Sequence, residues 1–478
     1  MPPQVLLVNP NRLQPAVAPL ALDYLADALV AEGAEVRLLD LCLEADPEVA
    51  IAQTLSRLDP ALVAVTIRNT DDCYCASADY FLPGFAALVS AIRGHTAAPI
   101  VVGGSGFSVA PAPILEAVGG DYGLHGDGEA PLAMLVSALA RKRPVETIPG
   151  LVWRDGDGYR VNPPWRGEVD ALPRRSRSLL DNVRYFREGG QAGIETKRGC
   201  DRLCIYCADP LGKGRRIRTR TPAQVADEFQ VLLAQGVDQV HLCDSEFNLP
   251  VAHALAVCQE LASIGLGERA RWYTYATPTG FTSDLAQAMR RAGCVGVNFG
   301  VDSGDDHMLA ALGRDFRSAD LWETARACRE AGLVFMFDLL LGGPGETRES
   351  VAHTIELMKQ ISPHRVGVSL GVRIYPGTAL CEQVTRNGLL AQNPNLRGAV
   401  SGNPDLIAPV FYLSAELGEN PERYVAERVG GDPRFFFPTA EAGTEAYNYN
   451  DNQRLVEAIK QGHRGAYWDI LRRLSEGD

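Results

Sequence analysis

The sequence predicts an α/β protein that begins with a doubly wound, Rossmann-like parallel sheet and continues with a partial (β/α)6 barrel of the TIM type. Three observations support this fold class. Short apolar runs alternate with helical patterns from Val5 to Leu139, the same alternation resumes after a proline-rich interruption, and the sequence becomes irregular and rich in aromatic residues from Gln392 onward.

In the first part, five apolar runs have the length of buried parallel strands, and helical patterns lie between them. The expected strands are Val5–Val8, Val36–Leu39, Leu62–Ile67, Ile100–Val102 and Tyr122–Leu124, and the expected helices are Leu20–Ala31, Val49–Leu58, Phe81–Ile92 and Ala130–Leu139. Because strands and helices of these lengths alternate, residues 1–143 are expected to form one domain with helices on both faces of its sheet.

Residues 144–190 have a different character and are expected to form a linker. The run Gly150-Leu-Val-Trp-Arg-Asp-Gly156 predicts a small hairpin, and Pro163, Pro164 and Pro173 interrupt any helix.

The alternation then resumes over residues 191–391. The expected strands are Gly193–Lys197, Gln239–Cys243, Trp272–Ala276, Gly296–Val301, Phe335–Leu341 and Gly367–Ile374, and the expected helices include Pro222–Gln235, Leu285–Ala292, Asp320–Ala331 and Arg348–Gln360. These units predict a partial barrel with its active site at the carboxyl ends of the strands. Residues 392–478, which end in a helix at Ala466–Leu474, are expected to pack across the barrel mouth and cap the substrate.

The composition excludes several classes of protein. The 478 residues include 46 Lys and Arg against 59 Asp and Glu, a formal charge of −13, and 46% of them are hydrophobic. This hydrophobic content excludes disorder as the main state, and the acidic balance gives no reason to bind nucleic acid. Because the longest uncharged stretch near the N-terminus, Pro99–Leu115, is broken by glycines and prolines and no secretory signal precedes it, we expect no membrane partner and a cytoplasmic location.

Ligands of doubly wound sheets bind beyond the carboxyl ends of the strands. The loops that begin there start at Asn9-Pro10, Asp40, Arg68-Asn69, Gly103 and His125. Two of these loops contain glycine-rich runs, Gly103-Gly104-Ser-Gly106 and Gly126-Asp-Gly-Glu129, and glycine lets the backbone approach a large ligand closely. Neither follows the first strand or spells the dinucleotide fingerprint, which disfavours nucleotide binding of that kind.

Cys200, Cys204 and Cys207 form a C-x3-C-x2-C motif directly after the first expected barrel strand. Three thiolates so close along one loop can hold a 4Fe–4S cluster and leave its fourth iron open to another ligand. A zinc site is the alternative, but structural zinc prefers four ligands and no second cysteine pair follows. The total of 11 cysteines is odd, which indicates metal ligands and buried thiols rather than a disulfide framework.

The run from Lys197 to Cys207 resembles the signature of the radical SAM superfamily, in which the open iron is chelated by S-adenosylmethionine. Further motifs are similar to those of this superfamily in barrel order. They are Asp244-Ser245-Glu246-Phe-Asn, Gly300-Val-Asp302-Ser303-Gly, Gly342-Gly343-Pro-Gly-Glu-Thr and, as in members fused to a cobalamin-binding domain, Arg373-Ile-Tyr375-Pro-Gly-Thr.

The resemblance implies a role for each of these polar groups in binding S-adenosylmethionine. Tyr206 offers an aromatic face to the adenine, Asp244 and Glu246 can accept hydrogen bonds from the ammonium group, Asp302 and Ser303 can bind the ribose hydroxyls, and Arg314 can meet a carboxylate. The alternative for any one of them is a solvated loop residue.

The N-terminal domain is similar to the cobalamin-binding domain of cobalamin-dependent radical SAM enzymes. The resemblance implies that its loops contact cobalamin, with Asn9, Pro10, Arg68, Asn69, Gly103, Gly104, Gly106, Gly126 and Glu129 as the candidate residues. The histidine that ligates cobalt in many such domains is absent after the first strand, and His125 is interpreted as a loop residue. We hypothesise that Arg68 disfavours a lower axial ligand; an ordinary salt bridge to Asp71 or Asp72 is the alternative.

The chemistry that this resemblance implies is methyl transfer from S-adenosylmethionine, through methylcobalamin, to an unactivated carbon of a small-molecule or amino-acid-like substrate, with an external electron donor. The chain is most similar to the tryptophan 2-C-methyltransferases of natural-product biosynthesis, and Tyr447, Tyr449, Tyr467 and Trp468 are candidates to line a planar substrate. Two alternatives are a radical SAM enzyme that abstracts hydrogen, cyclises or rearranges its substrate and uses the N-terminal domain only as a scaffold, and a cobalamin-binding sensor or carrier.

Overall fold

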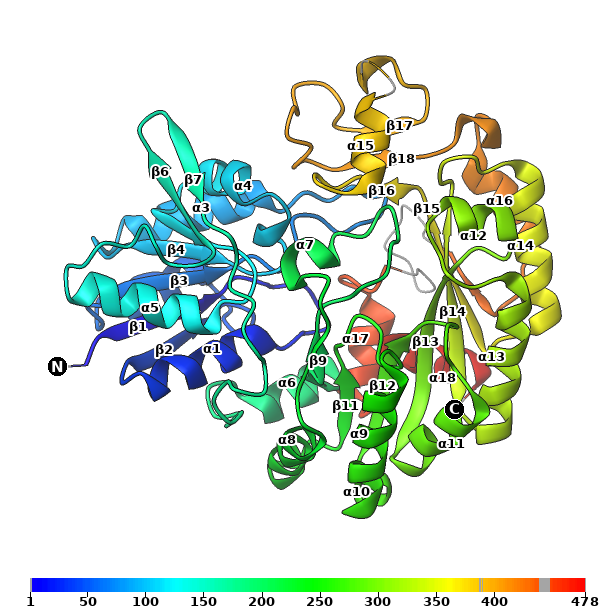
Figure 1. Cartoon of the computed structure of the whole chain (residues 1–478), viewed down its shortest axis with the longest axis horizontal. Helices are drawn as coiled ribbons and strands as arrows, with labels where there is room; N and C mark the ends of the chain where they lie inside the picture. The colour runs from blue at the N-terminus through cyan, green and yellow to red at the C-terminus, as the bar shows by residue number, and fades with distance from the viewer. Residues whose placement is uncertain (1, 387, 389, 438–447, 478) are drawn as a thin grey trace.

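The computed structural model describes residues 2–386, 388, 390–437 and 448–477 and confirms the α/β class. Two seven-stranded sheets lie side by side, the first built from the N-terminal third of the chain and the second from the barrel region (Figure 1).

The first sheet has the strand order β2-β1-β3-β4-β5-β6-β7, and its first five strands are parallel. Those strands are β1 (Gln4–Asn9), β2 (Glu35–Asp40), β3 (Leu62–Thr66), β4 (Ile100–Gly103) and β5 (Tyr122–Leu124). The helices are α1 (Leu20–Ala31), α2 (Pro47–Leu55), α3 (Leu82–Arg93), α4 (Pro111–Val118) and α5 (Glu129–Ala140), with a 3-10 turn η1 (Phe107–Val109). Apolar clusters on both faces of the sheet confirm that it is doubly wound.

The strand order reverses between β1 and β3, which is where doubly wound sheets bind ligands. The loops at this switch point begin with Asn9-Pro10 and Arg68-Asn69.

The hairpin expected in the linker completes the first sheet. Its strands, β6 (Leu151–Asp155) and β7 (Gly158–Val161), are antiparallel to β5 and to each other. Farther along the expected linker, α6 (Asn182–Gly189) precedes the barrel.

The second sheet is an open barrel with the order β19-β15-β14-β13-β12-β11-β8, all parallel. Its strands are β8 (Ala192–Ile194), β11 (Gln239–Leu242), β12 (Arg271–Ala276), β13 (Cys294–Asp302), β14 (Val334–Leu341), β15 (Arg365–Leu370) and β19 (Phe435–Phe436). Its helices are α7 (Asp209–Lys213), α8 (Pro222–Ala234), α9 (Val251–Ser263), α10 (Leu266–Arg269), α11 (Ser283–Arg291), α12 (Asp306–Ala311), α13 (Ser318–Ala331) and α14 (Arg348–Ile361). Side chains at alternate strand positions join the helices in one large core, and the intervening positions face the barrel interior.

Two of the expected barrel strands are shorter than the sequence predicts. The expected strand Gly367–Ile374 divides at Gly371, whose positive φ of 91° turns the chain, and β16 (Val372–Arg373) joins a separate sheet with β18 (Val410–Tyr412) and β17 (Leu396–Gly398). The expected strand Gly193–Lys197 likewise ends at Ile194, and β9 (Lys197–Arg198) pairs with β10 (Arg218–Thr219) instead.

The C-terminal segment only partly follows the expectation that it covers the barrel mouth. Its first part contains β17 and β18 and lies near α15 (Ala379–Arg386) at the carboxyl ends of the strands (Figure 1). After α16 (Pro421–Val429) and β19, the helices α17 (Gln453–Lys460) and α18 (Tyr467–Glu476) pack against Tyr273 and Met336, near the amino ends of β12 and β14. These helices therefore close the opposite end of the barrel.

Trp468 is one consequence of this arrangement. The side chain is 4% exposed and packs edge-on against Tyr273, with ring centroids 6.1 Å apart. The expectation that Trp468 lines the substrate is therefore wrong, because the ring fills the apolar core at the amino end of the barrel. Tyr447 lies outside the described residues.

The domains are joined by a buried charge network. Glu129, at the start of α5, accepts hydrogen bonds from both terminal nitrogens of Arg198 in β9, at 2.9 and 2.5 Å. Burial by itself raises the pKa of Glu129, but the charge and hydrogen bonds of Arg198 outweigh it and lower the pKa to about 2.

We expect Glu129→Gln to destabilise the protein by about 3 kcal/mol at pH 7, because it leaves the Arg198 charge buried beside a neutral amide. Since the native pKa of Glu129 is depressed, this stabilisation is present above its unfolded pKa of about 4.5 and is lost as the pH falls toward about 2. Thermal unfolding of both proteins between pH 7 and pH 3 measures the difference, and Asp155→Asn, at an exposed ion pair with Arg160, is the control. An equal melting temperature for Glu129→Gln and the wild type at pH 7 would contradict this prediction.

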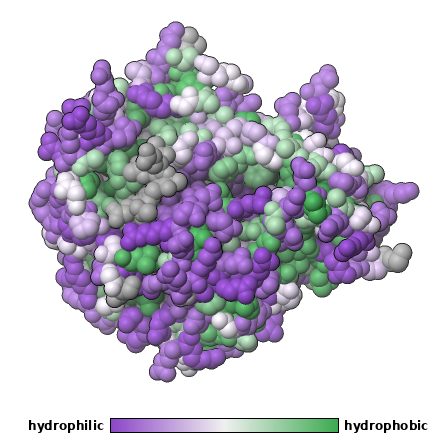
Figure 2. All heavy atoms as spheres, turned by 180° about the vertical axis from the view of Figure 1, so that it is seen from behind, coloured by the Kyte–Doolittle hydropathy of each residue, from purple (hydrophilic) through white to green (hydrophobic). Residues whose placement is uncertain are grey.

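Figure 2 shows a face on which hydrophilic residues predominate and apolar residues form separate small patches. No helix among the described residues is long and apolar enough to cross a bilayer.

Candidate active site

The three cysteines of the motif lie on a loop that two glycines hold in place. The loop follows β9, and the backbone amide of Cys200 donates to the carbonyl of Gly214 at 3.0 Å. Gly199 has a φ of 95°, and a Cβ there would lie 2.2 Å from the carbonyl oxygen of Arg216. Gly313 packs against the backbone of the same loop, because a Cβ on it would lie 2.4 Å from the carbonyl oxygen of Leu203. Close backbone packing, which only glycine permits, therefore fixes the cysteine loop.

The donor set of this loop fits an iron–sulfur cluster better than a single metal ion. All three thiols are free, and no three His, Cys, Asp or Glu side chains in the described part of the chain lie close enough together to hold one ion. Structural zinc prefers four closed ligands, whereas three cysteines on one loop can hold a cubane and leave its fourth iron open. Burial raises the pKa of the Cys200 thiol to about 11 and that of Cys207 to about 12, so iron must displace their protons on binding.

Beside the cysteines, Tyr206, Asp302 and Arg314 form one connected group. The Tyr206 hydroxyl donates to Asp302 Oδ2 at 2.6 Å, and Arg314 Nε lies 3.5 Å from the same oxygen. Arg314 Nη1 also lies 3.0 Å from Cys204 Sγ. The structure thus brings together three candidates from separate parts of the barrel and places a guanidinium charge against one of the predicted cluster ligands.

The carboxylates of the Asp244-Ser245-Glu246 motif have different surroundings. Asp244 is 2% exposed and accepts hydrogen bonds from the backbone amides of Thr196 and Lys197, while Lys197 Nζ lies 3.3 Å away. Its side chain therefore holds the cysteine-bearing loop against β11. Ser245 donates to Asp209 Oδ2 at 2.5 Å.

Glu246 is the carboxylate of this motif with the strongest electrostatic perturbation. Burial raises the pKa of Glu246 to about 7, although the charge of Arg314 opposes the shift. A carboxylate that titrates near neutrality and lies next to the Arg314 group is suited to a ligand that carries charge.

Three further candidates from these motifs make their contacts within the protein. Ser303 is fully buried, and its hydroxyl lies 3.0 Å from that of Thr354, so it does not face an open site. Gly342 and Gly343 give room to neighbouring side chains, because Cβ atoms there would lie 2.6 Å from Leu413 Cδ1 and 3.0 Å from Leu312 Cδ2.

The glycines of the N-terminal loops mainly permit contacts within the protein. A Cβ at Gly104 would lie 2.6 Å from the carbonyl oxygen of Ile67, and one at Gly106 would lie 2.9 Å from the backbone of Asn69. Gly126 faces the linker, where its Cβ would lie 2.6 Å from an Arg166 nitrogen. Gly103 ends β4. These glycines allow the loops after β3 and β4 to pack closely against each other. The sequence had suggested them for a different reason, the close approach of a ligand to the backbone.

Asn9 and Glu129 have their side chains bonded elsewhere. Asn9 is 1% exposed and donates to Asp40 Oδ1 at 2.8 Å, and Glu129 is held by Arg198 as described above. Pro10 and Asn69 are half-buried at the switch point.

Arg68 is exposed. Burial raises the pKa of Cys243 to about 11, that of Tyr275 to about 12 and that of Tyr467 above its ordinary value, and the charge of Arg68 opposes all three shifts. The loop after β3 therefore carries a positive charge close to the barrel. Among the described residues, the alternative salt bridge of Arg68 to Asp71 or Asp72 is not formed. Asp71 pairs with Arg373, with Nη2 and Oδ2 2.9 Å apart, and Asp72 accepts a hydrogen bond from Ser77.

Arg373 and Tyr375 join the two domains at this point. Arg373 stacks on the Tyr375 ring at 4.6 Å, and the Tyr375 hydroxyl lies 2.9 Å from Cys73 Sγ in the loop after β3. Both side chains, predicted to bind a cofactor, thus contact the N-terminal domain directly.

The interior face of the barrel holds residues that the sequence reasoning did not single out. Tyr275 points inward from β12 and yet is 45% exposed, and Cys243, which follows β11 on its inward side, is also exposed. Side chains on the inner wall of a barrel remain accessible only where the interior is hollow. The period-2 alternation of β12 could have identified Tyr275, because the outward positions Trp272 and Ala276 are apolar and Tyr275 lies on the opposite face.

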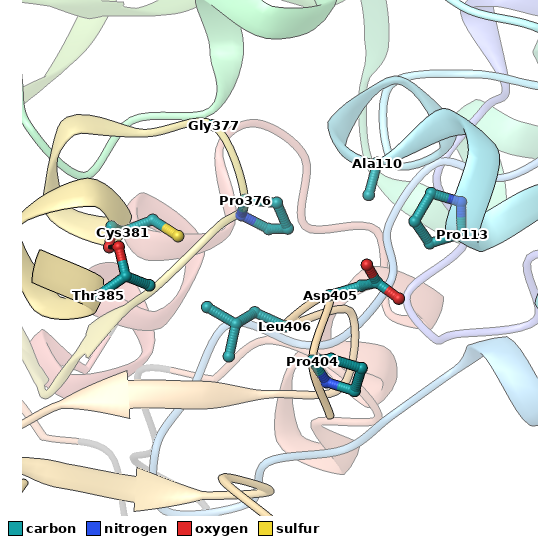
Figure 3. Close-up of a pocket in the computed structure, with 9 residues that line it drawn as sticks. All are labelled: Ala110, Pro113, Pro376, Gly377, Cys381, Thr385, Pro404, Asp405 and Leu406. Atoms are coloured by element: carbon teal, nitrogen blue, oxygen red, sulfur yellow. Dashed lines mark hydrogen bonds between the residues drawn. The ribbon is translucent and has the colours of Figure 1, made fainter. Parts of the chain in front are cut away.

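A surface pocket of about 350 Å³ includes none of the three cysteines in its lining. It is lined by Ala110, Pro113, Pro376, Gly377, Cys381, Thr385, Pro404, Asp405 and Leu406, which come from the start of α4, from α15 and the turn before it, and from the segment between β17 and β18 (Figure 3). Asp405 is the one charged residue in this lining, and no predicted cofactor ligand takes part.

Two family comparisons match the two halves of this architecture. Residues 11–136 match the B12 binding domain, and residues 194–358 match the radical SAM superfamily. The chain is 31% identical to the tryptophan 2-C-methyltransferase of Streptomyces laurentii, over 97% of this chain and 95% of the relative. It is 28% identical to an uncharacterized methyltransferase of Pyrococcus horikoshii, over 78% and 79% of the two chains.

Solved structures give the same result. The methyltransferase TsrM from Kitasatospora setae, with tryptophan and the S-adenosylmethionine analogue aza-SAM bound, superimposes with a TM-score of 0.91 at 31% identity and covers 99% of this chain and 98% of its own. TsrM with cobalamin and a [4Fe–4S] cluster bound superimposes with a TM-score of 0.89 at 30% identity, covering 100% and 98%. OxsB, a cobalamin-dependent radical enzyme, shares the fold, with a TM-score of 0.69 at 18% identity and coverage of 86% and 64%.

Proposed function

Because this chain belongs to the cobalamin-dependent radical SAM methyltransferases, we propose that it transfers a methyl group from S-adenosylmethionine to C2 of the tryptophan indole. The observation that carries this proposal is the similarity to TsrM, a relative with tryptophan bound, which extends over nearly the whole of both chains, including the C-terminal segment.

We assign the three cofactors to the groups described above. Cys200, Cys204 and Cys207 would hold the 4Fe–4S cluster. S-adenosylmethionine would lie beside Tyr206, Asp302 and Arg314, which already form one connected polar group, and beside Glu246, whose pKa the Arg314 charge influences. Cobalamin would be held between the barrel and the loops at the β1/β3 switch point, one of which carries Arg68 close to Tyr275 of the barrel. When bound, cobalamin supplies the methyl carrier between S-adenosylmethionine and the substrate carbon.

The chain itself would hold and orient these groups. Arg314 places a positive charge beside Cys204, which favours the thiolate that iron requires. The Asp71–Arg373 pair and the Glu129–Arg198 pair fix the N-terminal domain against the barrel, so that a ligand between them is shielded from water. An external electron donor would keep the enzyme in its reduced, active state.

The experiment uses enzyme purified anaerobically and reconstituted with iron, sulfide and hydroxocobalamin. It is incubated with S-adenosylmethionine that carries a trideuterated methyl group and with tryptophan deuterated at C2. We expect mass spectrometry to show a methylated tryptophan that gains the labelled methyl and loses the C2 deuterium. A methylated product that keeps this deuterium would move the reaction to another carbon, and deoxyadenosine formation without methylation, or no corrin binding, would favour the hydrogen-abstracting alternative.

A further inference from the structure

The interior of the barrel contains a polar pair that neither the cluster site nor the switch-point loops use. Asn298 in β13 donates from Nδ2 to Asp338 Oδ2 in β14 at 2.6 Å. Both side chains point inward, because their strand neighbours Phe299 and Phe337 belong to the outer core with the helices. A carboxylate inside a barrel requires a specific reason, since burial of a charge is unfavourable.

The side-chain oxygen of Asn298 is an unused hydrogen-bond acceptor inside the barrel. Asn298 is only 5% exposed, and its Oδ1 atom has no hydrogen-bond partner among the residues that the structure describes. Because the amide nitrogen faces Asp338, the amide oxygen must face another direction. A buried acceptor of this kind indicates that a donor from a bound molecule completes its hydrogen bonding.

Three tyrosines from different parts of the chain lie close enough to Asp338 to feel its charge. Tyr275 comes from β12, Tyr74 from the loop after β3 and Tyr449 from the C-terminal segment. Burial and then the Asp338 charge raise the pKa of all three hydroxyls, that of Tyr275 to about 12, so each lies within electrostatic reach of the carboxylate. His241, whose ring centroid is 4.9 Å from that of Tyr275, is neutral near pH 7, because burial lowers its pKa to about 4.

We propose that Asp338 and Asn298 bind the α-ammonium group of the amino-acid substrate inside the barrel. The carboxylate supplies the opposite charge, the amide oxygen accepts a second hydrogen bond, and the tyrosine rings favour a cation. Tyr275, 45% exposed on the same inner wall, shows that the interior is open beside this pair. The inference rests on the proposed function, since it names the group by which the substrate is held.

Three probes separate the substrate's charges: L-tryptophan, tryptamine, which lacks the carboxylate, and indole-3-propionate, which lacks the ammonium. Equilibrium dialysis with the reconstituted, cobalamin-loaded enzyme measures their affinities. We expect the wild type to bind tryptophan and tryptamine at least about tenfold more tightly than indole-3-propionate. Asp338→Asn should weaken binding of the two amines by about 30-fold, since a hydrogen bond to a charged group is lost, and should change indole-3-propionate binding less than about twofold.

Two further variants control for folding and for general charge effects. Asn298→Ala should weaken amine binding by about fivefold, since it removes only the second acceptor. Glu356→Gln removes a carboxylate from the exposed face of α14 and should leave all three affinities unchanged. Cobalamin content and melting temperature show whether each variant is folded.

The outcomes distinguish this inference from the function on which it rests. If the wild type neither binds nor methylates tryptophan, both fail. If the wild type methylates tryptophan but Asp338→Asn binds tryptophan as tightly as the wild type does, only the ammonium assignment is overturned. The assignment is also overturned if Asp338→Asn loses affinity for tryptophan and for indole-3-propionate to the same extent, and the carboxylate then contacts the indole.

Discussion

Replacement of Cys207 with alanine is expected to abolish the visible absorption of the 4Fe–4S cluster and to reduce methyl transfer by more than about 100-fold, because no other described cysteine lies on the loop to replace the lost ligand. A cubane held by two cysteines would expose a second iron to water and would be lost during purification. Iron and sulfide analysis after anaerobic reconstitution measures the cluster, and the methylation assay measures the activity.

Cys381→Ala is the matched control, because it removes a half-buried thiol on α15 that lies outside the cysteine loop. We expect this variant to retain its iron and its activity. If the Cys207 variant kept four irons per chain, or if wild-type protein carried one zinc ion in place of iron, the assignment of the cluster to this loop would be wrong.

Glu228→Gln is expected to destabilise the folded protein by about 3 to 5 kcal/mol, because it leaves two buried arginines without their shared carboxylate. Glu228 lies in α8 and is 1% exposed. Its carboxylate lies 3.1 Å from Arg177 Nη1 and 2.5 Å from Arg220 Nη1, and it accepts a hydrogen bond of 2.8 Å from Tyr24 in α1. The residue therefore balances the charges where the two domains meet, and its loss should lower the melting temperature by several degrees.

Tyr24→Phe provides the comparison for this prediction. It removes one neutral donor from the same carboxylate and should lower the stability by only about 1 kcal/mol, although both changes remove a hydrogen bond at the same place. Equal melting temperatures for the two variants would show that the charge of Glu228 contributes little to domain docking. Retention of cobalamin in both variants would show that the destabilisation does not act through the cofactor.

Much of the fold could be predicted because its signals are local. Buried parallel strands such as Val5–Val8 consist of consecutive apolar residues, and the helices between them have their own periodicity, so both sheets were expected. The short strands were harder to predict. β19 has only two residues, and its place beside β15 depends on a pairing across about 70 residues of chain that no local pattern specifies.

In the candidate site, too, local features could be predicted from the sequence and contacts between distant residues could not. The spacing of Cys200, Cys204 and Cys207 identified the cluster loop, because all three ligands lie within one short segment. Asp244, Ser303 and Glu129 were predicted to bind ligands because the motifs that contain them resemble those of the family. In the folded chain their side chains are bonded to Thr196, Thr354 and Arg198, partners up to 69 residues away that the sequence does not connect with them.

By itself the sequence determined the order of strands and helices, the class of both domains and the cysteine loop, since each depends on residues that are neighbours along the chain. Only the tertiary structure decided which polar groups satisfy one another and which remain open to a ligand. Asn298 and Asp338 illustrate the reason: they are separated by 40 positions and meet because two parallel strands lie in register, and their joint role exists only after the barrel has formed.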